Sequence, residues 1–169
     1  MYTQASTELS KAMKETIALL DSAPESTINK IPFKGSWTAA QTAQHLIKAG
    51  RGMPEIFKNP APKAKRQPDE KVGEWKEIML DPDSKMESPE FIVPEDRQYN
   101  KEKLINDTES IRKQTLEILK TADMDEIPDM EEGNPLKGST KLELLYFVIF
   151  HTQRHNRQMR KILETLNNS

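Results

Sequence analysis

The chain has 169 residues, of which 35% are hydrophobic and 31% charged, with a formal net charge of −2. A charge this close to neutral gives no electrostatic reason to expect a nucleic-acid partner, and no apolar run is long enough to predict a membrane span. Cysteine is absent, which excludes disulfides, thiolate metal ligands and cysteine nucleophiles. We expect residues 1–169 to form a single domain. The N-terminal residues are polar where a secretory signal would be apolar, so we expect a cytoplasmic location.

Two stretches in the first third of the chain have the periodicity of amphipathic helices. The first, over about 4–22, places apolar side chains at intervals of three and four residues. The second is expected over about 37–56. Thr38 and Gln41 match a capping box at its start, and Pro54 interferes near its end.

Residues 57–99 are expected to form a long crossover between the second and third helices. Its first part, KNPAPKAKRQP, is rich in lysine and proline and cannot continue a helix. We interpret its basic residues as a solvated linker: Lys58, Lys63, Lys65 and Arg66. A short helix is predicted over 69–80, and FIV at 91–93 is predicted to be a short extended piece. Connections of this length are usually functional or mobile.

Two further helices are expected in the second half of the chain. One covers about 100–121 and begins at Asn100, a good N-cap. The other covers about 139–166, where Thr140 and Glu143 match a second capping box. Four helices with one long crossover predict an all-α fold of the four-helix-bundle type.

The last helix carries two of the three histidines in the chain. At 100° per residue, His151 and His155 lie on the same side as the apolar residues that should face the core. Three basic residues of this helix fall on the far side, which we expect to face solvent: Arg154, Arg157 and Lys161. A pair of histidines on the surface is therefore not expected.

Histidines placed this way have two interpretations. Each ring nitrogen of a buried imidazole needs a partner, which is either a hydrogen bond or a metal ion. The third histidine, His45, lies in the second helix beside small residues that leave space next to its ring: Thr38, Thr42 and Ala49. Three histidines from two helices would supply the usual protein share of a catalytic zinc site. On these residues alone, both interpretations stay open.

Three motifs of the sequence resemble those of a known family. SWTAAQTAQHL, which contains Trp37 and His45, and HTQRHNRQMRKIL, which contains His151 and His155, resemble the DinB/YfiT-like superfamily of four-helix bundles, as does the preceding GNPLKGSTKLELL. The resemblance implies that these three histidines bind one divalent metal, with zinc or nickel expected.

The resemblance also implies a class of activity. Members of this superfamily include thiol-dependent S-transferases, an isomerase and proteins described as metal-dependent hydrolases. It therefore implies a divalent-metal-dependent S-transferase or hydrolase with a small-molecule substrate, a low-molecular-weight thiol as co-substrate, and a homodimeric assembly. The alternative is a non-enzymatic helical bundle that binds a partner or a small ligand, with the histidines in a polar core.

Other polar residues near the histidines receive no catalytic assignment. No H-E-x-x-H motif supplies a glutamate with a role as base, so we name no general base. The polar neighbours of the histidines are interpreted as ordinary helix residues: Gln41, Gln44, Asn156 and Gln158. Trp37 is expected either to fix the start of the second helix or to form a wall of the site.

Overall fold

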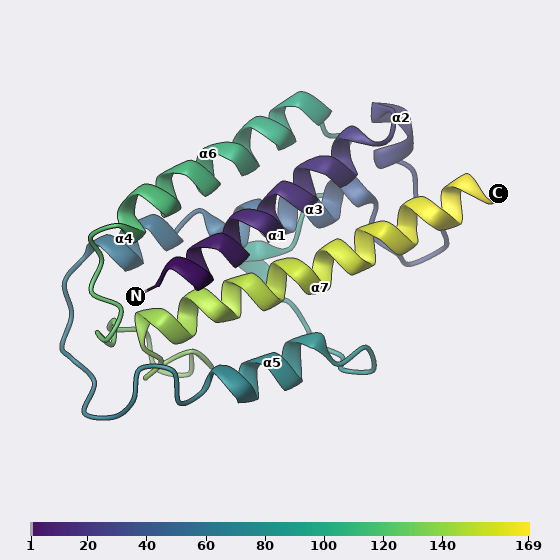
Figure 1. Ribbon diagram of the computed structural model, residues 1–169. Coiled ribbons are helices and arrows are strands. Elements are labelled where there is room, and N and C mark those ends of the chain that lie inside the picture. The colour runs from purple at the N-terminus through teal and green to yellow at the C-terminus, as the bar shows by residue number, and fades with distance from the viewer. Residues whose placement is uncertain (1) are drawn as a thin grey trace.

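The computed structural model describes residues 2–169 and contains helices but no strands within that range (Figure 1). The fold class is all-α, as the sequence predicts. No helix in the described range is long and apolar enough to cross a membrane. The elements in chain order are α1 (Thr3–Asp21), α2 (Glu25–Ile28), α3 (Ala39–Gly50), α4 (Met53–Lys58), α5 (Val72–Leu80), the 3₁₀ helix η1 (Glu90–Ile92), α6 (Lys101–Leu119) and α7 (Lys141–Asn167).

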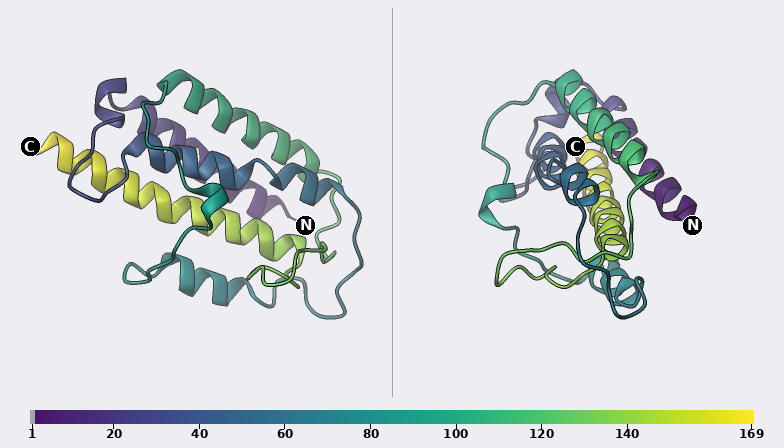
Figure 2. Two further views of the ribbon diagram at one scale, coloured as in Figure 1. Left: turned by 180° about the vertical axis from the view of Figure 1, so that it is seen from behind. Right: turned by 90° about the vertical axis from the view of Figure 1, so that its left-hand side faces the viewer.

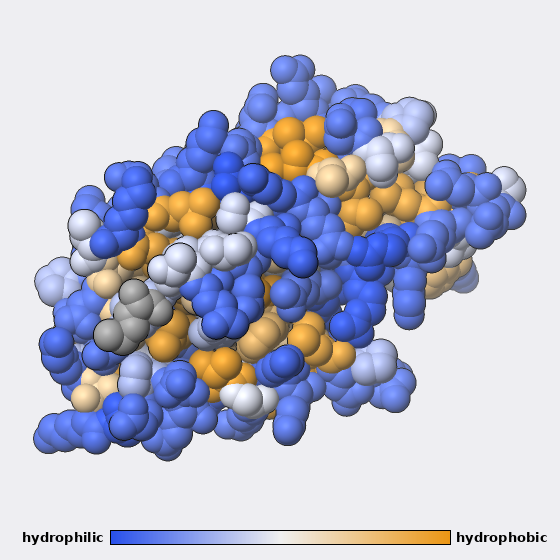
Figure 3. Space-filling model, viewed as in Figure 1, coloured by the Kyte–Doolittle hydropathy of each residue, from blue (hydrophilic) through white to orange (hydrophobic). Residues whose placement is uncertain are grey.

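Helices α1, α3, α6 and α7 form a four-helix bundle around one apolar core. Both α1 and α3 pack against α6 and α7, and α7 runs along the whole molecule (Figure 1). Several core side chains are at most 1% exposed: Leu9, Leu20, Ile47, Leu145 and Ile149. Figure 3 shows one face of the surface, which is mostly hydrophilic with apolar side chains gathered in patches.

The helix expected over 37–56 is two helices in the structure. Helix α3 ends at Gly50, and α4 begins at Met53 after Gly52. Proline has no backbone N–H, so Pro54 is tolerated in the first turn of a helix but would break the ladder of a continuous one. The chain therefore restarts a helix here, with the Ile56 N–H donating to the Gly52 carbonyl.

The helix starts that carry a capping signal are where the sequence places them. Thr38 and Thr140 are N-caps with complete capping boxes, and Asn100 caps α6 by accepting from the Lys103 N–H. These caps satisfy backbone donors that have no partner inside the helix. The caps at Thr38 and Thr140 fix the starts of the two helices that carry the histidines.

Helix α5 covers part of the side of α7 that the sequence assigns to solvent. That expectation is therefore wrong for Arg154 and Arg157, whereas Lys161 is exposed as expected. Helix α5 lies alongside α7 (Figure 1). Arg154 donates to carbonyl oxygens of Met79, Asp81 and Ser84, and Arg157 donates to that of Leu80. A cation at the C-terminus of a helix stabilises it by complementing the dipole and binding its free carbonyls.

The segment after α5 returns across the bundle and places η1 against α3, as Figure 2 shows in its left view. The expectation of an extended piece over 91–93 is therefore wrong for most of it. The N–H groups of Ile92 and Val93 donate to the carbonyls of Pro89 and Glu90, which closes a 3₁₀ turn.

The basic part of the crossover is more than a solvated linker. Arg66 makes two hydrogen bonds of 2.6 and 2.7 Å to the Glu143 carboxylate, whose side chain is fully buried. Lys63 lies 2.9 Å from Asp123. A buried carboxylate needs a cation and hydrogen bonds, and the capping box of α7 creates that need at Glu143. The crossover is therefore anchored at the start of α7.

Candidate metal centre

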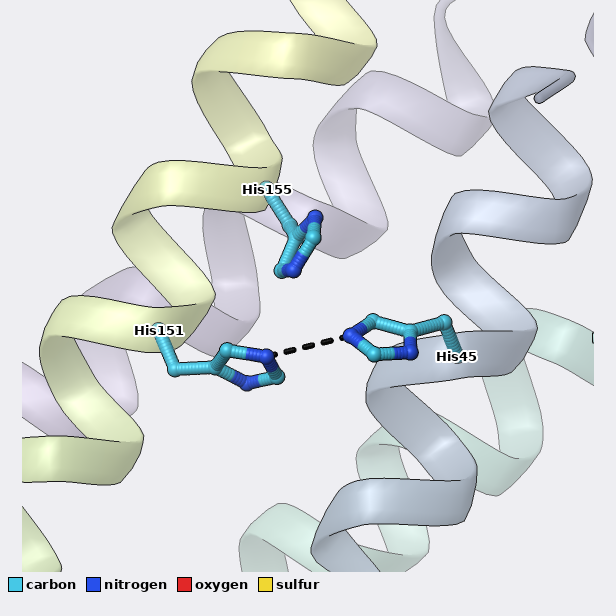
Figure 4. Close-up of side chains that lie close together, drawn as sticks. All are labelled: His45, His151 and His155. Carbon is cyan, nitrogen blue, oxygen red and sulfur yellow. Dashed lines mark hydrogen bonds between the residues drawn. The ribbon is translucent and has the colours of Figure 1, made fainter. Parts of the chain in front are cut away.

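The three histidines meet between α3 and α7 (Figure 4). His45 comes from the middle of α3, while His151 and His155 lie one turn apart on α7, so their side chains leave the same face of that helix. His45 is fully buried, and the other two are partly buried. Residues that are about a hundred positions apart in the sequence are thus brought to one point, as the metal interpretation of the sequence requires.

The ring nitrogens are close enough together to bind one metal ion. The Nε2 atoms of His45 and His151 are 3.0 Å apart. The ring centroid of His155 lies 4.5 Å from that of His45 and 4.6 Å from that of His151. One nitrogen from each histidine can be chosen so that all three lie within 4.8 Å of one another.

Two of the rings are oriented by hydrogen bonds to their other nitrogen. His45 Nδ1 lies 3.0 Å from the carbonyl oxygen of Ile92, and His155 Nδ1 lies 2.8 Å from Oε1 of Gln158. Both oxygens are acceptors, so each Nδ1 carries the proton and each Nε2 keeps its lone pair. Hydrogen bonds of this kind set the tautomer of metal-binding histidines and fix the ring orientation.

The surroundings keep the three imidazoles neutral. Burial lowers the pKa of His45, and burial together with the charges of His155 and His45 places the pKa of His151 well below its usual value. Burial, with a smaller effect of His45, lowers the pKa of His155 to about 4. Neutral imidazole is the form that binds metal, so at neutral pH the cluster does not need to lose a charge first.

Aromatic rings enclose the cluster. The Trp37 ring centroid lies 5.1 Å from that of His45 and 6.4 Å from that of His155, and Phe147 stacks on His151 at 5.9 Å. Trp37 packs on two of the rings but does not line the cavity beside them, so its expected role as a wall of the substrate pocket stays a prediction. An apolar wall limits the access of water to the cluster.

Two contacts of the site were not assigned from the sequence. The sequence predicts an ordinary polar residue at Gln158, although its position three residues after His155 places the two side chains on one face. The carbonyl of Ile92 carries no sequence signal, since every residue has one. Two of the other polar neighbours have structural roles: Asn156 bonds to Thr16 and to the Ala12 carbonyl, and Gln41 completes the capping box of α3.

The donor set fits a divalent transition metal. Zinc binds imidazole nitrogen at about 2.0–2.1 Å, so ligand nitrogens in a tetrahedral site lie about 3.3 Å apart. The separation of 3.0 Å between two Nε2 atoms is close to that value. Imidazole ligands suit zinc and nickel alike. That the three histidines bind a metal stays a prediction, with the geometry in its favour.

Comparison with known proteins agrees with the fold and the cluster. The model of the DinB superfamily matches residues 8–159, a range that contains all three histidines. No curated protein and no solved structure matches the chain. Because the family model covers most of the sequence and the structure is the helical bundle that the resemblance implies, this chain belongs to the DinB superfamily.

Proposed function

We propose that the protein is a divalent-metal-dependent enzyme, either a thiol-dependent S-transferase or a hydrolase. The observation that carries the proposal is the convergence of three neutral imidazoles on one wall of a cavity of about 790 Å³. Histidines that only filled a polar core would not need such a space beside them. Active-site cavities usually have this size, with few polar groups.

The residues of the chain prepare the site in three ways. The Ile92 carbonyl and Gln158 bind Nδ1 of two imidazoles, so Nε2 is the nitrogen of each ring that carries the lone pair for a metal. In the metal-free structure that lone pair of His45 accepts a hydrogen bond from Nε2 of His151. Trp37 and Phe147 exclude water around the rings. A divalent metal in such a site supplies an open coordination position, at which it favours the thiolate of a thiol or lowers the pKa of a water molecule. Since the chain has no cysteine, the nucleophile comes from a small thiol or from water.

The proposal extends to the metal, the substrates and the assembly. We propose zinc or nickel as the metal, a small molecule as the substrate, and a low-molecular-weight thiol such as bacillithiol or mycothiol as co-substrate for the transferase. We also propose a homodimer. The exposed side chains of Ile31 and Phe33, which are 55% and 62% exposed, give a second copy an apolar surface to cover.

An activity screen on metal-loaded protein tests the proposal. Untagged protein reconstituted with zinc or nickel is assayed for transfer of several small thiols to an aromatic electrophile and for hydrolysis of activated esters. We expect turnover that requires the metal and is lost in His155→Ala but kept in Gln153→Ala, a substitution on the same helix. Metal binding without turnover in any assay would favour the non-enzymatic alternative.

A further inference from the structure

The cavity beside the histidines reaches into the core of the bundle. It is lined by side chains from all four bundle helices, among them Met13, Ile111 and Leu145, and it also touches the crossover at Met86 and Phe91. Close packing normally leaves few voids larger than a water molecule. A volume of about 790 Å³ is much larger than a packing defect and is large enough to hold a small molecule.

Two large apolar side chains that line this cavity are exposed to solvent. Phe91 and Met86 line it, although their side chains are 79% and 48% exposed. Large apolar side chains held in solvent beside a cavity favour the entry of an apolar molecule, because its arrival removes both surfaces from water.

The charged groups that line the cavity do not favour an anion. Lys48 is paired with Glu95 at 2.5 Å, and the guanidinium of Arg154 donates to carbonyls at the end of α5. The other charged lining residues are acidic and exposed: Glu87, Glu131 and Glu132. A carboxylate or phosphate entering here would meet acidic side chains, with both lining cations already engaged.

One polar group inside the cavity has no partner in the described part of the chain. The Thr115 side-chain hydroxyl is buried without a hydrogen bond, and the residue is 3% exposed. In contrast, Thr16, Thr108 and Thr152, which also line the cavity, each donate to the carbonyl one turn earlier. The hydroxyl oxygen has almost no surface that a water-sized atom can touch. A ligand atom can therefore recover the free-energy cost of the unpaired hydroxyl only after the Thr115 side chain rotates.

We propose that the cavity binds a neutral molecule with an apolar body, one polar atom of which bonds to the Thr115 hydroxyl after that side chain turns towards the cavity. Its reacting end faces His45, His151 and His155. Only that last statement rests on the proposed function. Binding of the body depends on the cavity alone, so it is expected with or without a metal.

Three matched ligands test this proposal on metal-free protein by fluorescence titration. The three ligands share one apolar body and differ in one substituent. Naphthalene has no polar group, 2-naphthol has a neutral hydroxyl, and 2-naphthoate has a carboxylate. We expect saturable binding in the order naphthol, naphthalene, naphthoate. The Thr115→Val variant should weaken naphthol by between about two- and tenfold and leave naphthalene unchanged. Equal effects on both ligands would overturn the role of the hydroxyl.

A second pair of variants tests the location. Val148 lines the cavity and is partly buried, whereas Val93 is 39% exposed and does not line it. Val148→Phe should weaken the binding of all three ligands at least tenfold, and Val93→Phe should leave their affinities unchanged. Melting curves confirm that both variants fold. The proposal would be overturned if the wild type bound none of the ligands or bound naphthoate most tightly. It would also be overturned if the two variants bound the ligands with equal affinity.

The two proposals fail separately. The His151→Ala/His155→Ala variant is expected to lose the metal but to keep a naphthalene site. Metal binding without a ligand site would contradict the cavity proposal only, and a ligand site in a protein that takes up no metal would contradict the proposed enzyme only.

Discussion

The carbonyl oxygen of Ile92 lies 3.0 Å from Nδ1 of His45 and ties the crossover to the histidine cluster. Ile92 belongs to η1, which packs on α3. The crossover is therefore a part of the site, because it fixes which nitrogen of His45 is free to bind a metal. Anything that loosens the crossover should also weaken the metal site.

Lys48 provides a way to loosen it without touching a histidine. Its ammonium group donates to the Val93 carbonyl at 2.9 Å and pairs with Glu95. We expect Lys48→Met to speed amide hydrogen exchange over 90–95 and to weaken zinc binding by about tenfold, measured by competition with a chromophoric chelator. Lys11→Met, at an exposed position on α1, is the control. Unchanged exchange and affinity in Lys48→Met would contradict the link.

Gln158 is expected to position His155 through its acceptor oxygen. Replacing it with leucine removes the hydrogen bond to Nδ1, and we expect metal affinity to fall between about 10- and 100-fold. Gln158→Glu keeps an acceptor and should restore most of the affinity. If the glutamate variant bound metal as weakly as the leucine variant, Gln158 would serve packing and not orientation.

Arg66 should matter for stability and not for metal binding. Removing it leaves the fully buried Glu143 carboxylate without its cation, which typically costs about 3–5 kcal/mol. We expect Arg66→Met to lower the free energy of unfolding by about 3 kcal/mol in urea titrations, with the metal content unchanged. Lys65→Met, at the exposed neighbouring position, should cost less than about 0.5 kcal/mol. Equal effects of the two substitutions would show that the ion pair contributes nothing.

The lowered pKa values of the histidines predict acid sensitivity of the metal-free protein. The unfolded chain takes up a proton on His155 near pH 6.5, whereas the folded chain does so only at about pH 4. The unfolded state thus binds more protons in this window, so stability is complete above pH 6.5 and falls as the pH drops towards 4. His155 alone accounts for on the order of 3 kcal/mol.

Urea titrations at pH 7 and pH 4.5 check this effect. Carboxylates also take up protons in the window, so the wild type is compared with His155→Gln, which lacks the titrating ring. We expect the loss of stability on acidification to be smaller in the variant by about 2 kcal/mol. An identical loss in the two proteins would show that His155 does not contribute.

The sequence predicted the parts of this structure that are set by local chemistry. Side-chain caps at Thr38, Asn100 and Thr140 mark helix starts because their oxygens bind backbone donors a few residues away. The spacing of His151 and His155 placed both on the inner face of α7. The same pattern could not separate α3 from α4, since Pro54 is compatible with either a kink or a new first turn.

The crossover was not predictable because long-range contacts hold it. Arg66 binds Glu143, which lies 77 residues later in the chain, and Arg154 binds carbonyls 70 to 75 residues earlier in the chain. Periodicity on α7 reports only which face is apolar, so a polar face covered by α5 resembles one that faces solvent. The Ile92 carbonyl enters the site by this long-range folding alone.

The metal content of the purified protein tests the central claim most directly. Untagged wild type and the His151→Ala/His155→Ala variant are incubated with zinc or nickel at a pH where histidine is neutral, and bound metal is measured by inductively coupled plasma mass spectrometry. Circular dichroism confirms that the variant is folded. We predict about one equivalent of metal in the wild type and none in the variant, as a single three-histidine site requires. A wild type that takes up no metal, or a variant that binds as much, would contradict the claim.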